Sequence, residues 1–281
     1  MAAEQALVLG GGGVAGIAWM TGLLAGLADT GEDVTGDTDL VIGTSAGANV
    51  AAQLGSGLPL EELFARQVDP ALQSRELMAE VDWVKFAAQL EPYVAGASTL
   101  TDQLRGFGEF ALSAQTVPEP ERRAVIQSRL PSHDWPATPT TLVAVDCVSG
   151  ELAAFDSSSE VSLVDAVAAS SAVPGIWPPV TIAGRRYMDG GVRSADNADL
   201  AAGARRVLVI SPIGMDSPLP TLLPLREVLA RLKDDGATVV VISPDEASVA
   251  AIGTNALDPA TRVPAATAGR AQGRAGLPPA F

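Results

Sequence analysis

The sequence is poor in positive charge, cysteine and histidine, and each shortage excludes a class of function. Its 281 residues carry 18 Lys and Arg against 33 Asp and Glu, so the net charge is −15. This acidity argues against nucleic acid as a partner and against electrostatic docking on anionic lipid. Cys147 is the one cysteine and His133 the one histidine. The chain therefore has no internal disulfide and no ordinary Cys/His zinc set, and we expect no metal.

An uncharged run near the N-terminus, residues 6–28, resembles a membrane span or a signal peptide at first sight. No Lys or Arg precedes Arg66, so the run has no positive flank of the kind that signal peptides and membrane spans carry. Four consecutive glycines, 10–13, would also weaken a spanning helix. We therefore interpret the run as a buried strand, a glycine loop and a buried helix, and we expect a cytoplasmic protein.

Alternating strand and helix patterns predict an α/β fold, and a length of 281 residues with 47% hydrophobic residues provides an ample core. Residues 140–148 and 151–156 are predicted to form a hairpin, and two β-branched strands at 206–211 and 238–243 suit a βαβ unit. Residues 58–130 show no strong strand and are predicted to be helical, with one helix over 75–90. No linker divides the chain, so we expect a single domain, 1–281.

The most informative stretch is 40–48, in which three apolar residues lead into Gly43-Thr-Ser45-Ala-Gly47 and a helix-compatible segment. This is the pattern of a nucleophile elbow, where a serine stands on a strained strand-to-helix turn. Gly43 and Gly47 avoid side chains at crowded positions beside that turn. The alternative is an ordinary turn before a helix, because the five-residue pattern also arises by chance.

The glycine loop has two interpretations. Gly11-x-Gly13-x-x-Gly16 matches the dinucleotide-binding fingerprint, which also needs an acidic residue at the end of the next strand. Here the acidic residue, Asp39, lies at the start of that strand instead. The other use of such a loop is to present backbone N–H groups to an anion, such as the oxygen of a tetrahedral intermediate.

Four blocks in this order resemble the patatin-like phospholipases. They are the glycine loop 10–16, the elbow 43–47, Ala169-Ser-Ser-Ala-Val-Pro174 with Trp177-Pro-Pro179, and Met188-Asp-Gly-Gly-Val192. The resemblance implies a three-layer α/β/α fold with a central, mostly parallel sheet and a helical insertion. It also implies a Ser–Asp catalytic dyad in place of a triad.

Carried over by position, the resemblance makes Ser45 the nucleophile and Asp189 its partner, with the backbone N–H groups of Gly11, Gly12 and Gly13 as the oxyanion hole. We expect no role in catalysis for His133, which lies in a proline-bounded loop. No organic cofactor is implied.

The resemblance implies a serine acyl hydrolase that acts on lipid esters, as a phospholipase A, a lysophospholipase or an esterase. Ala15 stands where the family often has arginine, and the lack of that cation weakens the prediction of a strongly anionic phospholipid substrate. Two alternatives stay open: a dinucleotide-binding oxidoreductase that uses the glycine loop, and a catalytically silent lipid-binding protein of the same fold.

The substrate pocket is predicted to involve apolar side chains from the first helix, the helical segment and the third block. These residues are Trp19, Met20, Phe86, Phe110 and Trp177. Apolar helical faces are usually core, so packing alone is the alternative for them. The expected partner is a lipid or acyl ester, with a transient membrane contact left open, and the oligomeric state is undetermined by the sequence.

Overall fold

The computed structural model describes residues 3–79, 81, 83–215 and 223–277. Its strands are β1 Gln5–Leu9, β2 Leu40–Thr44, β3 Thr140–Asp146, β4 Leu152–Phe155, β5 Val180–Ile182, β6 Arg185–Asp189, β7 Arg206–Ile210 and β8 Thr238–Ile242. Its α-helices are α1 Gly13–Asp29, α2 Ala46–Leu54, α3 Leu60–Val68, α4 Trp83–Val94, α5 Leu100–Ser113, α6 Glu119–Arg129, α7 Leu163–Ser170, α8 Leu225–Asp234, α9 Glu246–Ile252 and α10 Arg262–Gly273.

The described strands form one mixed, mostly parallel sheet in the order β5-β6-β3-β2-β1-β7-β8, with β4 paired to β3. The pairs from β3 through β2, β1 and β7 to β8 are all parallel. The hairpins β3–β4 and β5–β6 are antiparallel, and β6 joins the sheet antiparallel to β3. The predicted α/β class, the 140–156 hairpin and the βαβ unit around α8 are confirmed.

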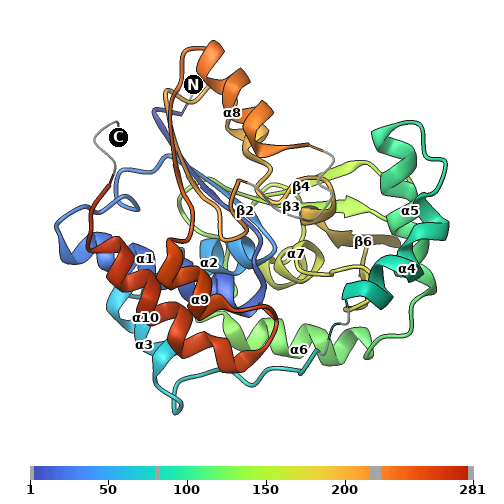
Figure 1. Ribbon diagram of the computed structural model, residues 1–281, viewed down its shortest axis with the longest axis horizontal. Helices are drawn as coiled ribbons and strands as arrows, with labels where there is room; N and C mark the ends of the chain where they lie inside the picture. The colour runs from blue at the N-terminus through green and yellow to red at the C-terminus, as the bar shows by residue number, and fades with distance from the viewer. Residues whose placement is uncertain (1–2, 80, 82, 216–222, 278–281) are drawn as a thin grey trace.

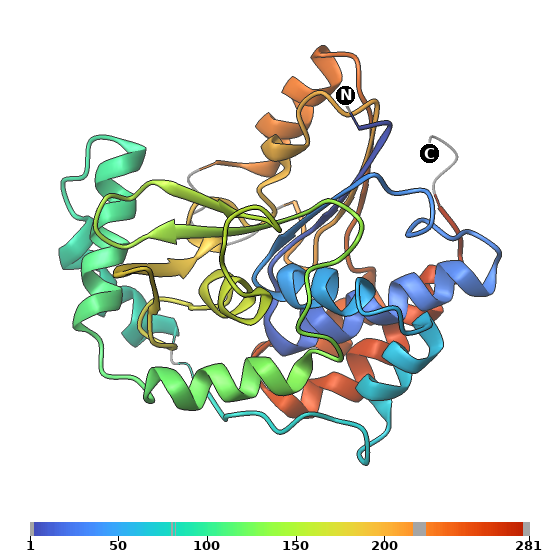
Figure 2. The same cartoon turned by 180° about the vertical axis from the view of Figure 1, so that it is seen from behind.

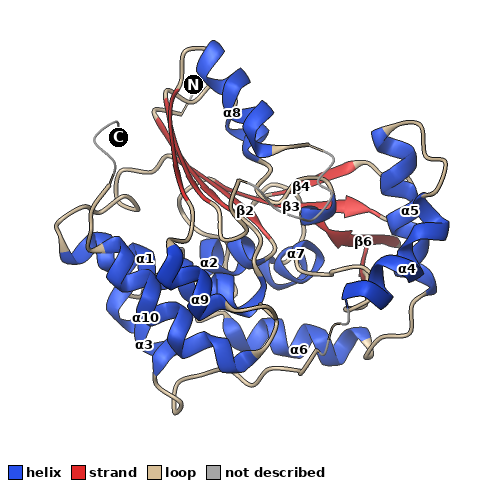
Figure 3. Ribbon diagram, in the orientation of Figure 1, coloured by secondary structure: helices blue, strands red, loops and turns tan. Residues whose placement is uncertain are grey.

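Helices cover both faces of this sheet and make three layers (Figures 1 and 3). On one face lie α1, α2 and α7, whose apolar residues form a large core with the sheet. On the other face α8 and the short 3₁₀ helix Ala198–Ala201 pack on β1, β7 and neighbouring strands. Among the described residues, no helix is both long and apolar enough to cross a membrane.

Helix α1 is buried almost all round because α10 covers the side that faces away from the sheet (Figure 1). Their backbones approach closely: a Cβ atom added at Gly22 would lie 2.0 Å from the carbonyl oxygen of Ala266. Trp19 and Met20 are completely buried in this core, and Trp19 Nε1 donates a hydrogen bond to Gln272 of α10. Their prediction as pocket residues is therefore wrong, because α10 and the sheet enclose them.

Helices α4 and α5 pack at the β6–β3 side of the sheet, as the view from behind also shows (Figure 2). Between α3 and α6 the described residues contain no strand, as predicted. The helix predicted over 75–90 begins only at Trp83. Residues 73–79 are instead irregular, and Glu76 within them contacts buried arginines, which no helical pattern could have shown.

Candidate active site

Ser45 occupies a sharp turn between β2 and α2, at the carboxyl edge of the parallel strands. Its backbone angles, φ 53° and ψ −109°, lie outside the regions that L-residues usually adopt, so the turn stores strain. A Cβ atom at Gly43 would lie 2.8 Å from Cα of Ala48, and one at Gly47 would lie 1.9 Å from the Leu9 carbonyl oxygen. Both positions therefore require glycine for α2 to turn back so tightly.

Hydrogen bonds from α2 and α7 hold the strained backbone of Ser45. The Ser45 N–H donates to Ser170 Oγ at 2.9 Å. Its carbonyl oxygen accepts from Asn49 Nδ2 at 3.0 Å and from Ser171 Oγ at 3.3 Å. Asn49 in turn accepts a hydrogen bond from Arg129 Nη1 at 3.3 Å. The turn is thus fixed from both sides, which preorganises the position of the hydroxyl.

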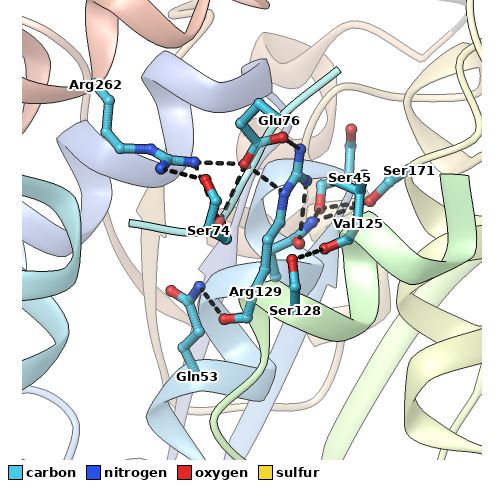
Figure 4. Close-up of polar contacts among 10 residues, drawn as sticks. Ser45, Gln53, Ser74, Glu76, Val125, Ser128, Arg129, Ser171 and Arg262 are labelled. Carbon is cyan, nitrogen blue, oxygen red and sulfur yellow. Dashed lines mark hydrogen bonds and ion pairs between the residues drawn. The ribbon is translucent and has the colours of Figure 1, made fainter. Parts of the chain in front are cut away.

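A buried ion-pair cluster lies beside this network and is joined to it through Arg129 (Figure 4). Glu76 accepts from Arg129 of α6 and from Arg262 of α10, and the three side chains are between 3% and 6% exposed. Burial alone would raise the pKa of Glu76, but the charges of the arginines and the Arg129 hydrogen bonds hold it below 4.5. Gln53 Nε2 also donates to the Arg129 carbonyl oxygen at 3.1 Å.

The strand register brings Asp189 level with Ser45. Thr44 lies opposite Val143 of β3, and Asp189 at the end of β6 lies opposite Ala144. Asp189 Oδ1 accepts a hydrogen bond from the Gly191 N–H at 2.7 Å. Its Oδ2 is buried, and no hydrogen-bond partner for this oxygen is found among the described residues. That oxygen is therefore available to the Ser45 hydroxyl.

The environment of Asp189 favours a carboxyl group that titrates near neutral pH. Burial raises its pKa to about 7, although the Ser45 hydroxyl, the Gly191 N–H and the charge of Arg122 oppose this rise. A carboxylate with such a pKa is a far better proton acceptor at neutral pH than an exposed aspartate.

The glycine loop supplies two uncommitted backbone donors beside Ser45. The Gly11 N–H already donates to the Ala195 carbonyl oxygen at 2.8 Å. For Gly12 and Gly13, no acceptor for the N–H group is found in the part of the chain that the structure describes. Both groups lie at the positive end of α1. Of the three glycines predicted to form an oxyanion hole, Gly11 thus has an N–H group that is already bonded, whereas those of Gly12 and Gly13 have no acceptor among the described residues.

A largely apolar cavity of about 270 Å³ opens from the serine. The glycine loop, Ser45 and Asp189 line one end, and Phe86, Leu90 and Phe107 of α4 and α5 line its wall. Phe110 does not line this cavity. It packs edge-on against Phe86 with ring centroids 5.7 Å apart, and lines a separate hollow that does not include Ser45.

A second, smaller cavity of about 40 Å³ lies on another side of Ser45. Its lining is more polar and includes Asn49, Arg122 and Ser171, together with Trp177. The structure thus places Phe86 and Trp177 in two different cavities that both reach Ser45.

Two sequence alternatives can be compared with this geometry. His133 is exposed, its Nε2 lies 3.2 Å from the Gln127 carbonyl oxygen, and it lines neither cavity at Ser45. Asp39 Oδ2 accepts from the N–H groups of Glu4 and Gln5 at the amino end of β1. That acidic residue is far along the strand from the glycine loop, so it cannot bind a ribose there. Across the described residues, no three His, Cys, Asp or Glu side chains form a metal-binding group.

This fold and site define a class: three-layer α/β/α proteins with a strained serine at a strand–helix turn and a buried carboxylate level with it. The sequence matches the family model for Patatin-like phospholipase over residues 7–202. The chain therefore belongs to the patatin-like phospholipase family, a family of lipid hydrolases.

Solved structures with a similar chain include VipD from Legionella pneumophila, with a TM-score of 0.45, 13% identity, and a match covering 96% of this chain and 66% of VipD. Another is the type III effector protein ExoU, with a TM-score of 0.42, 14% identity, and a match covering 97% of this chain and 52% of ExoU. The chain thus spans about two thirds of the length of VipD and about half of the length of ExoU. No curated protein sequence matches it.

The sequence analysis missed the buried polar residues around Ser45, namely Asn49, Glu76, Arg122, Arg129 and Arg262. A signal for two of them exists in α6, where Arg122, Ile126 and Arg129 are spaced to share one helical face and all are buried. In an amphipathic helix an arginine usually marks the solvent side, so this face would have been read as exposed.

Proposed function

We propose that this protein is a serine acyl hydrolase that cleaves fatty-acyl esters of lipids through a dyad of Ser45 and Asp189. The observation that carries the proposal is the buried Asp189 carboxylate beside the strained Ser45, at the end of an apolar cavity. A nucleophile, a base with a matched pKa and a dry pocket are the elements that ester hydrolysis by covalent catalysis requires.

The reaction begins with attack of Ser45 Oγ on the ester carbonyl carbon while its proton passes to Asp189. The carbonyl oxygen becomes an oxyanion, and the N–H groups of Gly12 and Gly13 stabilise it. The carbon–oxygen bond to the alcohol breaks, Asp189 returns the proton to that alcohol, and an acyl-serine remains. Water then attacks the acyl-serine, Asp189 accepts its proton and passes it to Ser45 Oγ, and the fatty acid leaves.

The raised pKa of Asp189 predicts the pH dependence of this reaction. The base must be ionised to accept the serine proton, and its pKa is about 7. We therefore expect kcat/KM to rise as the pH increases through about 7 and to level off above it. A constant kcat/KM between pH 5 and 8 would contradict the role of Asp189 as the base.

The apolar cavity suggests an acyl chain as the group that it binds. Its walls come from α4 and α5, and an acyl chain gains about 0.8 kcal/mol for each buried methylene group. The competing proposal, a catalytically silent lipid-binding protein of this fold, uses the same cavity without hydrolysis. The competing dinucleotide site would need an acidic residue at the carboxyl end of β2, whereas Asp39 precedes that strand and binds the N–H groups of Glu4 and Gln5.

The proposal is tested by hydrolysis of a series of 4-nitrophenyl esters with increasing acyl length. We expect turnover by the parent protein, and a loss of at least a thousandfold in both Ser45→Ala and Asp189→Asn. The double variant should lose little more, because a nucleophile and its base act as a unit. His133→Ala serves as the control and should stay within a few-fold of the parent. Full activity in folded Asp189→Asn would reject the dyad.

A further inference from the structure

Arg122 on α6 is a buried cation that lacks a paired carboxylate among the described residues. The residue is 6% exposed, and its guanidinium lies over the Trp177 ring, 3.9 Å from the ring centroid. Its Nε and Nη1 atoms are buried, and nowhere in residues 3–79, 81, 83–215 and 223–277 do they find a hydrogen-bond acceptor. Buried guanidinium donors without acceptors are costly, so their retention needs an explanation.

The neighbouring charges leave this cation without neutralisation by an ion pair. Arg129 and Arg262 both bind Glu76, so a single carboxylate serves two other arginines. Burial, together with the charge of Arg129, lowers the pKa of Arg122 to about 9, although the charges of Glu76 and Asp189 oppose this fall. Arg122 is therefore still positively charged at neutral pH, beside Ser45 in a strongly acidic protein.

Arg122 lies where the alcohol side of an ester bound at Ser45 would extend. It lines the small polar cavity, which shares Ser45, Gly13 and Val173 with the large apolar cavity. A substrate with its acyl chain in the apolar cavity and its carbonyl at Ser45 can extend its alcohol side into the polar one. There it meets Arg122, with Asn49 and Ser171 as further polar neighbours.

We propose that Arg122 binds an anionic group, a carboxylate or a phosphate, on the alcohol side of the cleaved ester. This inference rests on the proposed function, and it deepens it by naming a specificity-determining residue. A guanidinium presents several donors in a planar fork that fits both oxyanions, and such charge-assisted bonds are strong when water is excluded. The Trp177 ring holds the fork in place.

The volume of the polar cavity limits the size of the anion. Its roughly 40 Å³ provides space for about three water molecules. A compact terminal group, such as a phosphate monoester or a carboxylate, fits this space. Ala15 leaves the glycine loop without a cation, so α6 is the element that supplies positive charge to the site.

Binding to a catalytically inactive protein tests this site separately from hydrolysis. Decyl phosphate, decanoate and neutral decanol are titrated into Ser45→Ala below their aggregation limits and followed by calorimetry. We expect at least one of the two anions to bind 10- to 100-fold more tightly than decanol, and the better one identifies the group. Equal affinity for all three probes overturns the inference, whether or not the parent protein hydrolyses esters.

Variants of two adjacent arginines assign the preference to one residue. Arg122→Gln in the same background should remove most of the preference for the anion. The matched control is Arg123→Gln, because Arg123 is the next residue on α6 but its side chain is 39% exposed and paired with Asp165. Arg122→Lys keeps the charge and loses the fork, so it should retain part of the preference. An undiminished preference for the anion in folded Arg122→Gln overturns the assignment.

A kinetic experiment separates anion binding from an effect of Arg122 on Asp189. The ratio of kcat/KM for an anionic ester to that for its neutral analogue should fall at least tenfold in Arg122→Gln. If Arg122 acted only through the charge of Asp189, both esters would lose activity by the same factor. The pH profile of kcat/KM would then shift upward, because the pKa of Asp189 would lose an opposing charge. That result would overturn the proposed contact.

Discussion

Replacing Glu76 with glutamine removes the one carboxylate that two buried arginines share. The side chain is 3% exposed and accepts from Arg129 and Arg262, which are 5% and 6% exposed. In Glu76→Gln the shape is nearly unchanged, but both guanidinium groups lose their counter-charge. Removing one partner of a buried ion pair costs about 3–5 kcal/mol. For a chain of this size, we expect the melting temperature to fall by roughly 10 °C.

The assay compares thermal unfolding of the parent and the variant across pH. The arginines hold the pKa of Glu76 below its ordinary value of 4.5. The ionised carboxylate therefore makes its full contribution to the free energy of unfolding above pH 4.5, and this contribution disappears as the pH falls through the lowered pKa. The difference between the two proteins should therefore be constant above pH 5 and shrink in more acidic buffer.

The matched control is Glu227→Gln, the same chemical change at an exposed i,i+4 pair with Arg231 on α8. Its free energy of unfolding should change by less than about 0.5 kcal/mol. If Glu76→Gln lowers the free energy of unfolding by no more than this control does, the ion-pair cluster does not stabilise the protein as we argue.

Three further predictions concern the pocket, a buried acid and the elbow. Phe86→Ala should shift the acyl-length preference in ester hydrolysis while acetate cleavage changes little, and an equal loss for all esters would make the residue merely structural. Burial raises the pKa of Asp196 to about 7, although the neighbouring Ser211 hydroxyl opposes this rise. The protonated form of Asp196 therefore stabilises the fold below about pH 4, and this stability is lost as the pH rises through 7. Asp196→Asn should therefore gain stability relative to the parent, in denaturant titrations, between pH 5 and 8, and a pH-independent difference would contradict the shift. Gly47→Ala should prevent or strongly destabilise folding, whereas Gly11→Ala, whose nearest neighbour would lie 3.5 Å away, should melt within a few degrees of the parent.

Local patterns made much of the fold predictable. The hairpin of β3 and β4, the unit of β7, α8 and β8, and the strand leading into Ser45 all follow from alternation and turn residues over short distances. These features depend on neighbours in the sequence, and the structure has them close to the predicted bounds.

Long-range packing was not predictable in the same way. Trp19 and Met20 belong to an apolar helix, and only its cover by α10 shows that their side chains are enclosed by protein. Phe110 is one helical turn beyond the cavity-lining Phe107, and it packs against Phe86 without lining the cavity itself. A sequence pattern identifies such residues as apolar without showing which of them meets a cavity.

The buried charged residues were the main feature that the sequence did not predict. An arginine that pairs inside the protein looks in the sequence like one that faces solvent, because its pairing depends on residues far along the chain. Arg262 meets Glu76 across 186 positions, and no local pattern relates them. The glycine loop was similarly ambiguous, since only the tertiary contact with Ala195 shows that the Gly11 N–H is already bonded.

Labelling with a fluorophosphonate tests the central claim most directly, because the reagent forms a covalent bond only with an activated serine. The account predicts stoichiometric labelling of the parent protein, mapped by mass spectrometry to Ser45. It also predicts a large reduction in the labelling rate of folded Asp189→Asn and unchanged labelling of His133→Ala. No labelling of the folded parent, or modification of another serine in place of Ser45, would contradict the account.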